Sequence, residues 1–370
     1  MPPIISTAAT VCQDCYKCLR ECPAKAIRVH DGAAQVEDEL CIKCGHCVTA
    51  CPAGAKQVRD DVPLVRELLA GEEAVWCSIA PSWLGEFPET DAPRLCAALR
   101  ALGFAGVSET ALGAQEVSAH TAALLAAEPD RLWLSSACPS AVAWATRYAD
   151  CGAAVTPLLS PLLTHALMLR QRLQQPIRVV FVGPCIAKKM EVEKRPDLLD
   201  AAIGFTEVSA MFEAAGIDPS APAPDDAGFW PEQASDGALY PVEGGMLAGI
   251  RDGCGVAEAE LAAVAGLPAL REALAEPAAL EGVRFLELLA CPGGCIGGPC
   301  RRRPQGSLGK RRRIIATAPA AEMIPRRPSF DIHMDWSQPP VPVRQHDEAS
   351  IARALAQVGK YAQEDELNCG

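Results

Sequence analysis

A run of four cysteines that occurs twice near the start of this 370-residue chain constrains its fold more than any other feature. In each copy, two residues separate the first three cysteines, three residues precede the fourth, and a proline follows it. This spacing lets one short loop present three thiolates to a single inorganic centre. The proline has no N–H group and directs the chain away from that centre. The two runs comprise Cys12, Cys15, Cys18 and Cys22, and Cys41, Cys44, Cys47 and Cys51.

The doubled run resembles that of bacterial two-cluster ferredoxins, in which each fourth cysteine binds the other cluster. The resemblance implies two 4Fe–4S clusters in an α+β ferredoxin-like module over residues 1–60, followed by a short helical linker over residues 61–74. Zinc would need four ligands around one tetrahedral ion and would have no use for the crossed pattern. The module indicates electron transfer but names no reaction. By this pattern Cys12, Cys15, Cys18 and Cys51 bind the first cluster, and Cys41, Cys44, Cys47 and Cys22 bind the second.

Composition places the chain among globular proteins that bind metal. Hydrophobic residues make up 49% of the chain and charged residues 22%, and no run of about eighteen apolar residues occurs, so no membrane span is expected. The N-terminus lacks the basic and apolar segments of a secretory signal. Eighteen cysteines without such a signal indicate metal sites rather than disulfides, and we expect a cytoplasmic protein. The net charge of −12 argues against general nucleic-acid binding.

Two basic runs, at residues 301–303 and 310–313, stand out against the acidic balance of the chain. A solvated surface loop is the favoured interpretation. The alternative is a docking patch for an acidic redox partner, placed beside the last cysteine loop.

Three segments further along the chain present four more cysteines beside proline or glycine. Together these thiolates are enough for one further cubane cluster. Strand-like runs over residues 131–134, 177–182 and 283–288 end shortly before the cysteines. Because open α/β sheets place ligands beyond the carboxyl ends of their strands, one α/β domain is expected to gather the loops into a single site. The segments are residues 135–139, 183–191 and 291–298, which contain Cys138, Cys185, Cys291 and Cys295.

This α/β domain is expected to cover residues 75–315, in two lobes that divide near the Pro-, Ala- and Asp-rich residues 218–228. Its first strand, over residues 75–79, leads into Ala80, Pro81 and Ser82. Residues 316–370 are expected to form a C-terminal extension with one helix, over residues 349–361.

From about residue 75 to 310, the chain resembles the catalytic domain of iron–iron hydrogenases. The resemblance rests on the Cys-Pro-Gly-Gly-Cys segment that starts at Cys291 and on the Pro-Cys-x2-Lys-x2-Glu segment that starts at Pro184. It implies an H-cluster, in which a 4Fe–4S cubane is bridged to a two-iron subsite with carbon monoxide, cyanide and a dithiolate bridge. Hydrogenase maturation factors would supply that subsite. The implied cubane ligands are Cys138, Cys185, Cys291 and Cys295, with Cys295 also bridging to the two-iron subsite.

The same resemblance assigns three residues to the cyanide ligands: Ser82 and Lys188 as hydrogen-bond donors, and Pro184 as a backbone contact. Cyanide is an anion that needs a donor in a dry pocket, and an ammonium group is the strongest compact donor. Glu191 lies three residues after Lys188 and would share its face of a helix. There it could orient the lysine and balance its charge.

The chain departs from the pattern of fast hydrogenases on the open side of the subsite. Ala137 stands where those enzymes carry a cysteine that passes protons, and alanine has no group that titrates. Ser160 matches the serine of their proton relay. The carboxylates of that relay are missing: Glu116 is the only acid nearby, and His120 is either a substitute or structural.

Two more departures lie on the same side. Gly183 replaces a methionine of the fast enzymes. Pro299 and Cys300 interrupt the glycine-rich end of the third cysteine loop, and Cys300 either lines the pocket or is merely buried.

These departures resemble the divergent, sensory-type iron–iron hydrogenases, which keep the H-cluster but turn over slowly. The resemblance implies reversible dihydrogen oxidation and proton reduction, with electrons passing through the cubane and the two ferredoxin-type clusters. The expected partners are dihydrogen and protons, together with a ferredoxin-like redox protein or a downstream signalling protein.

Two other classes share this fold. A hydrogenase-like iron–sulfur assembly protein also has alanine before its first cubane cysteine and lacks the two-iron subsite, but it keeps a reduced set of module cysteines. The other class is a plain electron-transfer subunit with a degenerate site. Lys188 argues against that class, since a buried positive charge with no anion to meet costs stability.

Overall fold

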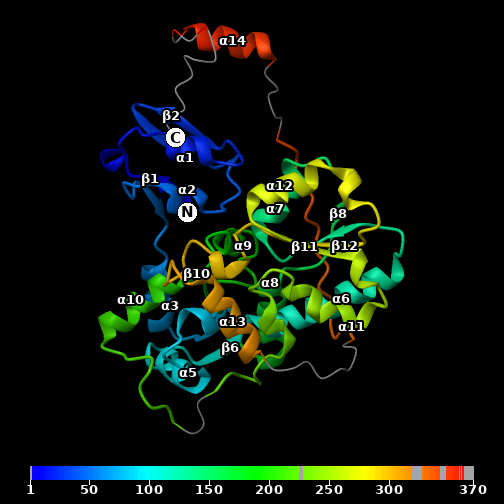
Figure 1. The fold of residues 1–370 in the computed structure, drawn as a ribbon. Coiled ribbons are helices and arrows are strands. Elements are labelled where there is room, and N and C mark those ends of the chain that lie inside the picture. The colour runs from blue at the N-terminus through cyan, green and yellow to red at the C-terminus, as the bar shows by residue number, and fades with distance from the viewer. Residues whose placement is uncertain are drawn as a thin grey trace.

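The computed structural model describes residues 2–224, 228–318, 327–341, 347–357, 359 and 361. A small N-terminal module sits on a larger domain built around two parallel sheets (Figure 1). The expected architecture, an α+β module followed by an α/β domain, is confirmed. Within the described part of the chain, no helix is both long and apolar enough to cross a membrane.

The module is held together by two short antiparallel sheets. β1 (Ile5–Thr7) pairs with β4 (Lys56–Val58), and β2 (Ile27–His30) pairs with β3 (Ala33–Val36). Each cysteine run forms a loop that leads into a short helix, α1 (Lys17–Glu21) or α2 (His46–Ala50). The loops turn at equivalent positions: φ is 50° at Asp14 and 54° at Tyr16 in the first, and 55° at Lys43 and 74° at Gly45 in the second. These left-handed turns give both loops the same curl around their cysteines.

Two four-stranded parallel sheets form the larger domain. The first has the strand order β10 (Ala201–Gly204), β9 (Ile177–Gly183), β5 (Ala74–Ile79) and β6 (Gly106–Glu109). The second has the order β11 (Leu261–Ala265), β12 (Phe285–Leu289), β7 (Trp133–Leu134) and β8 (Ala154–Val155).

The strands expected before the three cysteine loops are therefore confirmed as β7, β9 and β12. The expected division of the lobes near residues 218–228 does not match the sheets; of that stretch, 225–227 lie outside the described residues. The second sheet takes two strands from before the stretch and two from after it. Along the chain, pairs of strands alternate between the two sheets, so the chain passes from one sheet to the other more than once. Within each sheet, the parallel neighbours are joined by crossover connections.

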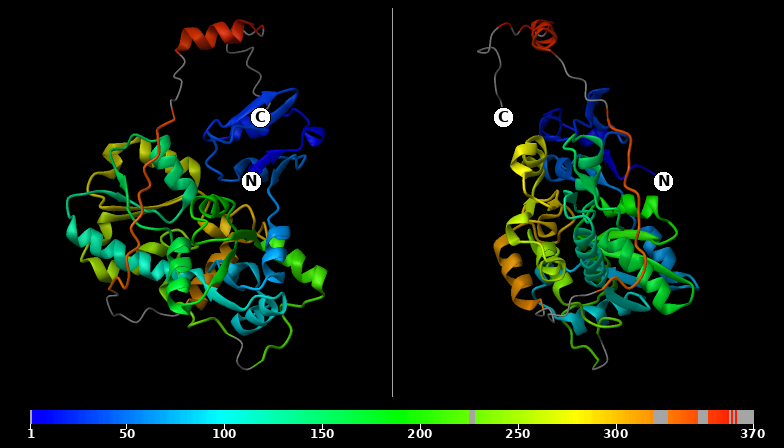
Figure 2. Two further views of the ribbon diagram at one scale, coloured as in Figure 1. Left: turned by 180° about the vertical axis from the view of Figure 1, so that it is seen from behind. Right: turned by 90° about the vertical axis from the view of Figure 1, so that its right-hand side faces the viewer.

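Helices cover the sheets and pass between them. α6 (Thr110–Ala127) packs closely on α8 (Pro161–Leu173) because Gly113 has no side chain: a methyl group there would lie 2.2 Å from the Pro161 carbonyl oxygen. The expected C-terminal helix is α14 (Glu348–Gln357), which stands away from the body (Figure 2); of the residues expected beyond it, 358 and 360 lie outside the described part. The other α-helices are α3 (Val62–Ala70), α4 (Trp83–Glu86), α5 (Ala92–Ala101), α7 (Pro139–Arg147), α9 (Lys188–Lys194), α10 (Phe205–Ala215), α11 (Gly245–Cys254), α12 (Leu267–Ala275) and α13 (Ser307–Thr317), and the short 3-10 helices are η1 (Ala9–Val11), η2 (Asp236–Leu239), η3 (Glu258–Glu260), η4 (Pro277–Leu280) and η5 (Cys295–Gly297).

Residues 327–341, the C-terminal strap, run along the outside of the larger domain (Figure 2). Ile332 and Trp336 of the strap are buried. The Trp336 indole N–H donates to the Leu158 carbonyl oxygen at 2.8 Å, and the Leu159 N–H donates to the Ile332 carbonyl oxygen at 2.7 Å. The strap therefore braces the segment that leads into α8.

Candidate functional site

The three cysteine loops of the larger domain meet at the carboxyl ends of strands from both sheets. Cys138 follows β7, Cys185 follows β9 and Cys291 follows β12. Burial raises the pKa of Cys185 to about 11, and the neighbouring Cys138 thiolate adds to this rise. Burial also raises the pKa values of Cys291 and Cys295, and each is raised further by the other thiolates. Such mutual effects require four thiols that lie close together, as the ligands of one cubane do.

A cavity lies beside these thiols, and Lys188 at the start of α9 reaches its wall. The ammonium group donates to both carboxylate oxygens of Glu191, at 3.0 and 2.9 Å, so the expected pairing is confirmed. The same nitrogen lies 3.3 Å from the Ser160 hydroxyl and 3.5 Å from the Ala137 carbonyl oxygen. Pro184 and Ala137 also line the cavity. Residues from three separate segments therefore converge at the Lys188 ammonium group.

Ser82 also lines this cavity. The side chain is 1% exposed, and its oxygen has no hydrogen-bond partner among the described residues. Burying a polar group without a partner costs about 1–3 kcal/mol. An unpartnered donor beside a lysine ammonium group therefore fits a cavity that holds an anionic ligand.

Two buried carboxyl groups near the site were not predicted. Glu287 of β12 lines the cavity; burial raises its pKa to about 8, although N–H groups at the start of α11 act in the opposite direction. Glu109, at the end of β6, has its pKa raised by burial to about 7. It accepts hydrogen bonds from the Trp83 indole at 3.2 Å and the Ala234 N–H at 2.7 Å. A lone acidic residue inside an apolar strand, as at Glu287, was the sequence signal available for this feature.

Phe181 was also missed, and it explains how the chain accommodates Gly183. Both residues lie on β9, two positions apart, and therefore face the same side of the strand. A methyl group on Gly183 would lie 2.4 Å from the Phe181 ring and 2.7 Å from Ala80. Phe181 itself lines the cavity, so its ring occupies the space beside the glycine.

Neither His120 nor Cys300 is among the residues that line the cavity. The His120 Nε2 atom lies 2.8 Å from the Phe330 carbonyl oxygen, which fastens the C-terminal strap. Cys300 is buried between the second cysteine loop and β10, where its N–H donates to the Pro184 carbonyl oxygen at 2.9 Å. Burial raises the pKa of its thiol to about 12. The structural interpretation of both residues therefore holds.

Residues 73–299 match the family described as iron only hydrogenase large subunit, C-terminal domain, and residues 4–52 match a 4Fe-4S dicluster domain. The chain belongs to the iron-only hydrogenase family. A curated relative, the NADP-reducing hydrogenase subunit HndD of Solidesulfovibrio fructosivorans, is 28% identical over 352 residues. That match covers 80% of this chain and 56% of the relative, so the chain spans little more than half of the relative's length.

Solved FeFe-hydrogenases share the fold of this hydrogenase-family chain. A structure described in terms of oxygen damage to the H-cluster matches with a TM-score of 0.57 at 17% identity, covering 73% of this chain and 92% of that one. The apo form of a HydA1 variant from Chlamydomonas reinhardtii matches with a TM-score of 0.55 at 18% identity, covering 70% and 88%. Identities this low speak for the fold alone.

In the module of this hydrogenase-family protein, the fourth cysteine of each run lies with the other run. Burial raises the pKa values of three thiols of the second run, Cys41, Cys44 and Cys47, and the Cys22 thiolate raises them further. The pKa of Cys47 reaches about 12. The pKa of Cys18 is likewise raised by burial and then by Cys51. The positions thus match the crossed pattern. The Cys44 thiolate also raises the pKa of Cys291, so the second run is close to the cysteine loops of the larger domain.

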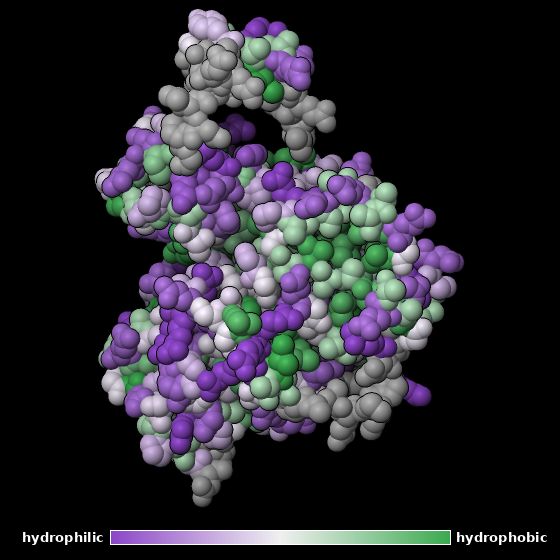
Figure 3. All heavy atoms as spheres, in the orientation of Figure 1, coloured by the Kyte–Doolittle hydropathy of each residue, from purple (hydrophilic) through white to green (hydrophobic). Residues whose placement is uncertain are grey.

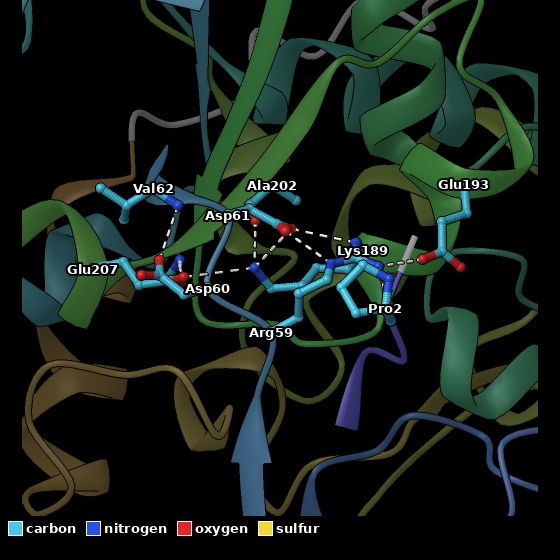
Figure 4. Close-up of polar contacts among 10 residues, drawn as sticks. Pro2, Arg59, Asp60, Asp61, Val62, Lys189, Glu193, Ala202 and Glu207 are labelled. Atoms are coloured by element: carbon cyan, nitrogen blue, oxygen red, sulfur yellow. Dashed lines mark hydrogen bonds and ion pairs between the residues drawn. The ribbon is translucent and has the colours of Figure 1, made fainter. Parts of the chain in front are cut away.

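An ion-pair network joins the module to the larger domain (Figure 4). We call it the interface network; it comprises Arg59, Asp61, Lys189, Glu193 and Glu207. Lys189 of α9 is 1% exposed and donates to the Asp61 carboxylate at 3.0 Å, with Glu207 at 3.6 Å. Arg59 follows β4, donates to Asp61 at 2.8 Å and pairs with Glu193. The network therefore ties the end of the module to the helix that carries the cavity lysine.

The two basic runs are largely paired within the chain. Lys310 is buried against Glu86, and Arg302 pairs with Glu89. Residues 310–313 belong to α13, so the solvated-loop interpretation is wrong for this run. Figure 3 shows mainly hydrophilic residues on the left and lower left of this face of the molecule and a broader hydrophobic region on its right-hand side. The Lys310–Glu86 pair anchors α13 to α4.

Proposed function

We propose that this protein is a low-turnover or sensory iron–iron hydrogenase that holds an H-cluster in the cavity beside its four clustered thiols. The observation that carries the proposal is the unpartnered Ser82 hydroxyl, which shares the cavity with the Lys188 ammonium group. Two hydrogen-bond donors in a buried cavity fit the cyanide ligands of a two-iron subsite. Ala137 on the same wall is the reason to expect slow turnover.

Each group of the site has a role in this proposal. The thiolates of Cys138, Cys185, Cys291 and Cys295 would hold the cubane, and Cys295 would also bridge to the two-iron subsite. Ser82 and Lys188 would donate to cyanide, and Pro184 would make a backbone contact. When bound, the two-iron subsite supplies the reversible splitting of dihydrogen.

The chain's own contribution is to orient a cation in a dry space. Glu191 is 1% exposed and accepts two hydrogen bonds from Lys188, which holds the ammonium group in one position. Pro161, Leu162 and Phe181 line the cavity with apolar surface that excludes water. Charge-assisted hydrogen bonds are stronger in such surroundings than in water.

Electron exchange would take place through the module. Its second cysteine run lies close to Cys291, whereas Cys15 of the first run is exposed. This order fits three 4Fe–4S clusters that lead from the cavity to the surface. The partner at that surface would be a ferredoxin-like redox protein or a downstream signalling protein; the relative HndD is named as a subunit of an NADP-reducing hydrogenase, which supports a redox partner. Maturation factors would load the two-iron subsite.

The second candidate is a hydrogenase-like assembly or electron-transfer protein without the two-iron subsite. Ala137 is compatible with it, and so is the Lys188–Glu191 pair. A buried lysine without an anion would cost stability, but Glu191 already supplies that anion. The distinction therefore rests on Ser82, whose hydroxyl has no partner in the described chain.

An infrared spectrum tests the proposal directly. The clusters would be reconstituted, the synthetic two-iron complex added, and spectra recorded with and without dihydrogen. Protein-bound carbonyl and cyanide bands that shift under dihydrogen are the expected result. A sample replete in cubanes that shows no bound bands would instead support the second candidate.

Ala137→Cys is expected to raise the turnover of the loaded protein by about 10²–10⁴-fold, the range typical of a positioned general acid. The thiol would place a titratable group on the cavity wall, where the parent has only a methyl group. Hydrogen evolution from a reduced artificial donor measures the effect. Ala137→Val, which adds bulk without a proton, is the matched control and should not accelerate turnover. An equal rate in both variants would contradict the explanation of slow turnover.

A further inference from the structure

A proton relay that leaves the cavity past Ala137 and along α6 is blocked in this protein. Ala137 carries no proton, and the C-terminal strap covers the part of α6 where relay carboxylates were sought. Glu116 accepts hydrogen bonds from the Ser329 N–H and hydroxyl groups, and His120 contacts Phe330. These two titratable side chains of α6 therefore hold the strap and do not reach the cavity. A slow enzyme still needs a path for protons.

Tyr240 is the first residue of a different path from the cavity. It lines the cavity and is 8% exposed. Its hydroxyl lies 2.9 Å from the hydroxyl of Ser118 on α6, and either oxygen can donate. Ser118 is 2% exposed, so this hydrogen bond lies inside the protein. Hydroxyl groups can accept one proton while releasing another, which makes such a pair suitable for proton transfer.

Asp236 of η2 lies on the far side of Ser118, across Gly249 of α11. A methyl group built on Gly249 would lie 2.7 Å from the Ser118 hydroxyl oxygen and 2.9 Å from the Asp236 Oδ2 atom. Both polar atoms therefore face the same small space, which stays open because residue 249 is glycine. The space connects a buried hydroxyl to a carboxylate.

Asp236 in turn leads to the surface. It is 8% exposed, and its Oδ1 atom accepts a hydrogen bond from the Ser235 hydroxyl at 3.0 Å. Ser235 is half-buried, and its hydroxyl oxygen also lies 3.1 Å from the Gln115 Oε1 atom, so its single proton can be shared between these two acceptors. Polar groups thus continue from the cavity wall to the solvent side of η2.

We propose that Tyr240, Ser118 and Asp236 carry protons between solvent and the cavity, in place of the relay that Ala137 interrupts. The proposal rests on the proposed function. A proton from solvent would bind the Asp236 carboxylate, cross the space beside Gly249 through one water molecule to the Ser118 oxygen as the Ser118 proton moves to Tyr240, and leave Tyr240 on the cavity side. One proton enters and one leaves, and no group changes its oxidation state. The reverse order carries protons out.

A second hydrogen-bonded chain starts at the cavity but does not serve this purpose. Thr110 lines the cavity and contacts Ser78 at 2.8 Å, and Ser78 contacts the His165 Nδ1 atom at 2.8 Å. The His165 Nε2 atom then contacts Ser108 at 2.8 Å. His165 and both serines are 0% exposed, so the chain ends in the core. Burial also lowers the pKa of His165 to about 3, which keeps the imidazole neutral.

Tyr240→Phe is the main test in the loaded protein, because it removes one hydroxyl and keeps the ring. Turnover should fall by about 10²-fold, with a larger solvent isotope effect, while the carbonyl and cyanide bands stay at their parental positions. Asp236→Asn should act alike, and small weak acids in the buffer should restore part of its rate. Thr121→Val is the matched control on α6, since the Thr121 hydroxyl bonds only to the Val117 carbonyl oxygen of its own helix, at 2.8 Å.

A second readout does not need the two-iron subsite. In protein that holds cubanes alone, the infrared carboxylate stretch of Asp236 is identified by its loss in Asp236→Asn. This band should shift in Tyr240→Phe and in Gly249→Ala, because the first removes a member of the chain and the second fills the space between Ser118 and Asp236. Thr121→Val should leave the band unchanged.

The outcomes separate the two proposals. Intact cofactor bands with turnover in Tyr240→Phe within twofold of the parent would overturn the proton route and leave the proposed function standing. An Asp236 band unaffected by Tyr240→Phe would also overturn the route. Absence of bound carbonyl and cyanide bands in the parent itself would overturn the proposed function, and the route with it.

Discussion

Lys188→Met is expected to abolish retention of the two-iron subsite while the four-cysteine cubane stays in place. Methionine has a similar length but no charge, so the cavity loses its cation. The variant also leaves Glu191 buried at 1% exposure without its ion-pair partner. Removing one partner of a buried pair costs about 3–5 kcal/mol. At the size of this domain, such a loss lowers the melting temperature by on the order of 10 °C.

Infrared spectra and thermal unfolding of the cubane-replete protein would measure the two effects separately. The bound cyanide bands should disappear, and the melting temperature should fall. The informative control is the double variant Lys188→Met with Glu191→Leu, which removes both charges and places apolar side chains there. Replacing a whole buried pair by apolar residues is often neutral for stability. The double variant should therefore regain stability but still fail to hold the subsite.

The double variant also tests whether Lys188 donates to cyanide. If the double variant retained the infrared bands at parental intensity, the role of Lys188 as a cyanide donor would be excluded. Ser82→Ala extends the test, because it removes a hydroxyl that has no partner in the described chain. It should weaken retention of the subsite without destabilising the protein, since no intramolecular hydrogen bond is lost.

The cysteines proposed as cluster ligands stand out in the sequence because their spacing is local. Three cysteines within seven residues must lie on one loop, and Lys188 and Glu191 three residues apart share a helix face. The meeting of the three cysteine loops also followed from local signals, because each loop comes directly after a strand and parallel strands end on the same edge of a sheet.

Features that depend on contacts between distant segments were out of reach. Ser118 and Tyr240 are 122 residues apart in the chain, and His120 and Phe330 are 210 apart. No pattern in either segment indicates its partner. The mixed origin of the second sheet has the same cause, since strand order is decided by packing of the crossover helices. Phe181 shows a further limit. The sequence places it two residues before Gly183, but it does not indicate that the Phe181 ring fills the space beside the glycine.

Lys189→Met is expected to loosen the module from the larger domain and to weaken the magnetic interaction between their clusters. Lys189 is 1% exposed and binds Asp61 and the Ala202 carbonyl oxygen, at 3.0 and 2.8 Å (Figure 4). Its loss should cost about 3 kcal/mol, at the low end for a buried pair, because Arg59 still contacts Asp61 at 2.8 Å. The remaining contacts between the two parts, such as Gly45 packed against Ile186 and Pro299, would then hold the module less firmly.

Electron paramagnetic resonance of the reduced, cubane-replete protein measures this coupling without any two-iron subsite. Cys44 of the second run is close enough to Cys291 to raise its pKa. Clusters held by these cysteines would therefore interact magnetically at short range. Lys189→Met should reduce the spin–spin splitting at an unchanged iron content. Lys194→Met is the matched control, since Lys194 lies on the same helix outside the interface network and contacts the strap instead, with its ammonium group 5.9 Å from the centre of the Trp336 ring. Loss of this cation–π contact should change the protein's stability by no more than about 1 kcal/mol and leave the splitting at the parental value. If Lys189→Met kept the parental splitting while it lost stability, the network would be a structural brace only. Reduced splitting in Lys189→Met alone would show that a buried lysine next to the cavity lysine sets the position of the electron-transfer module.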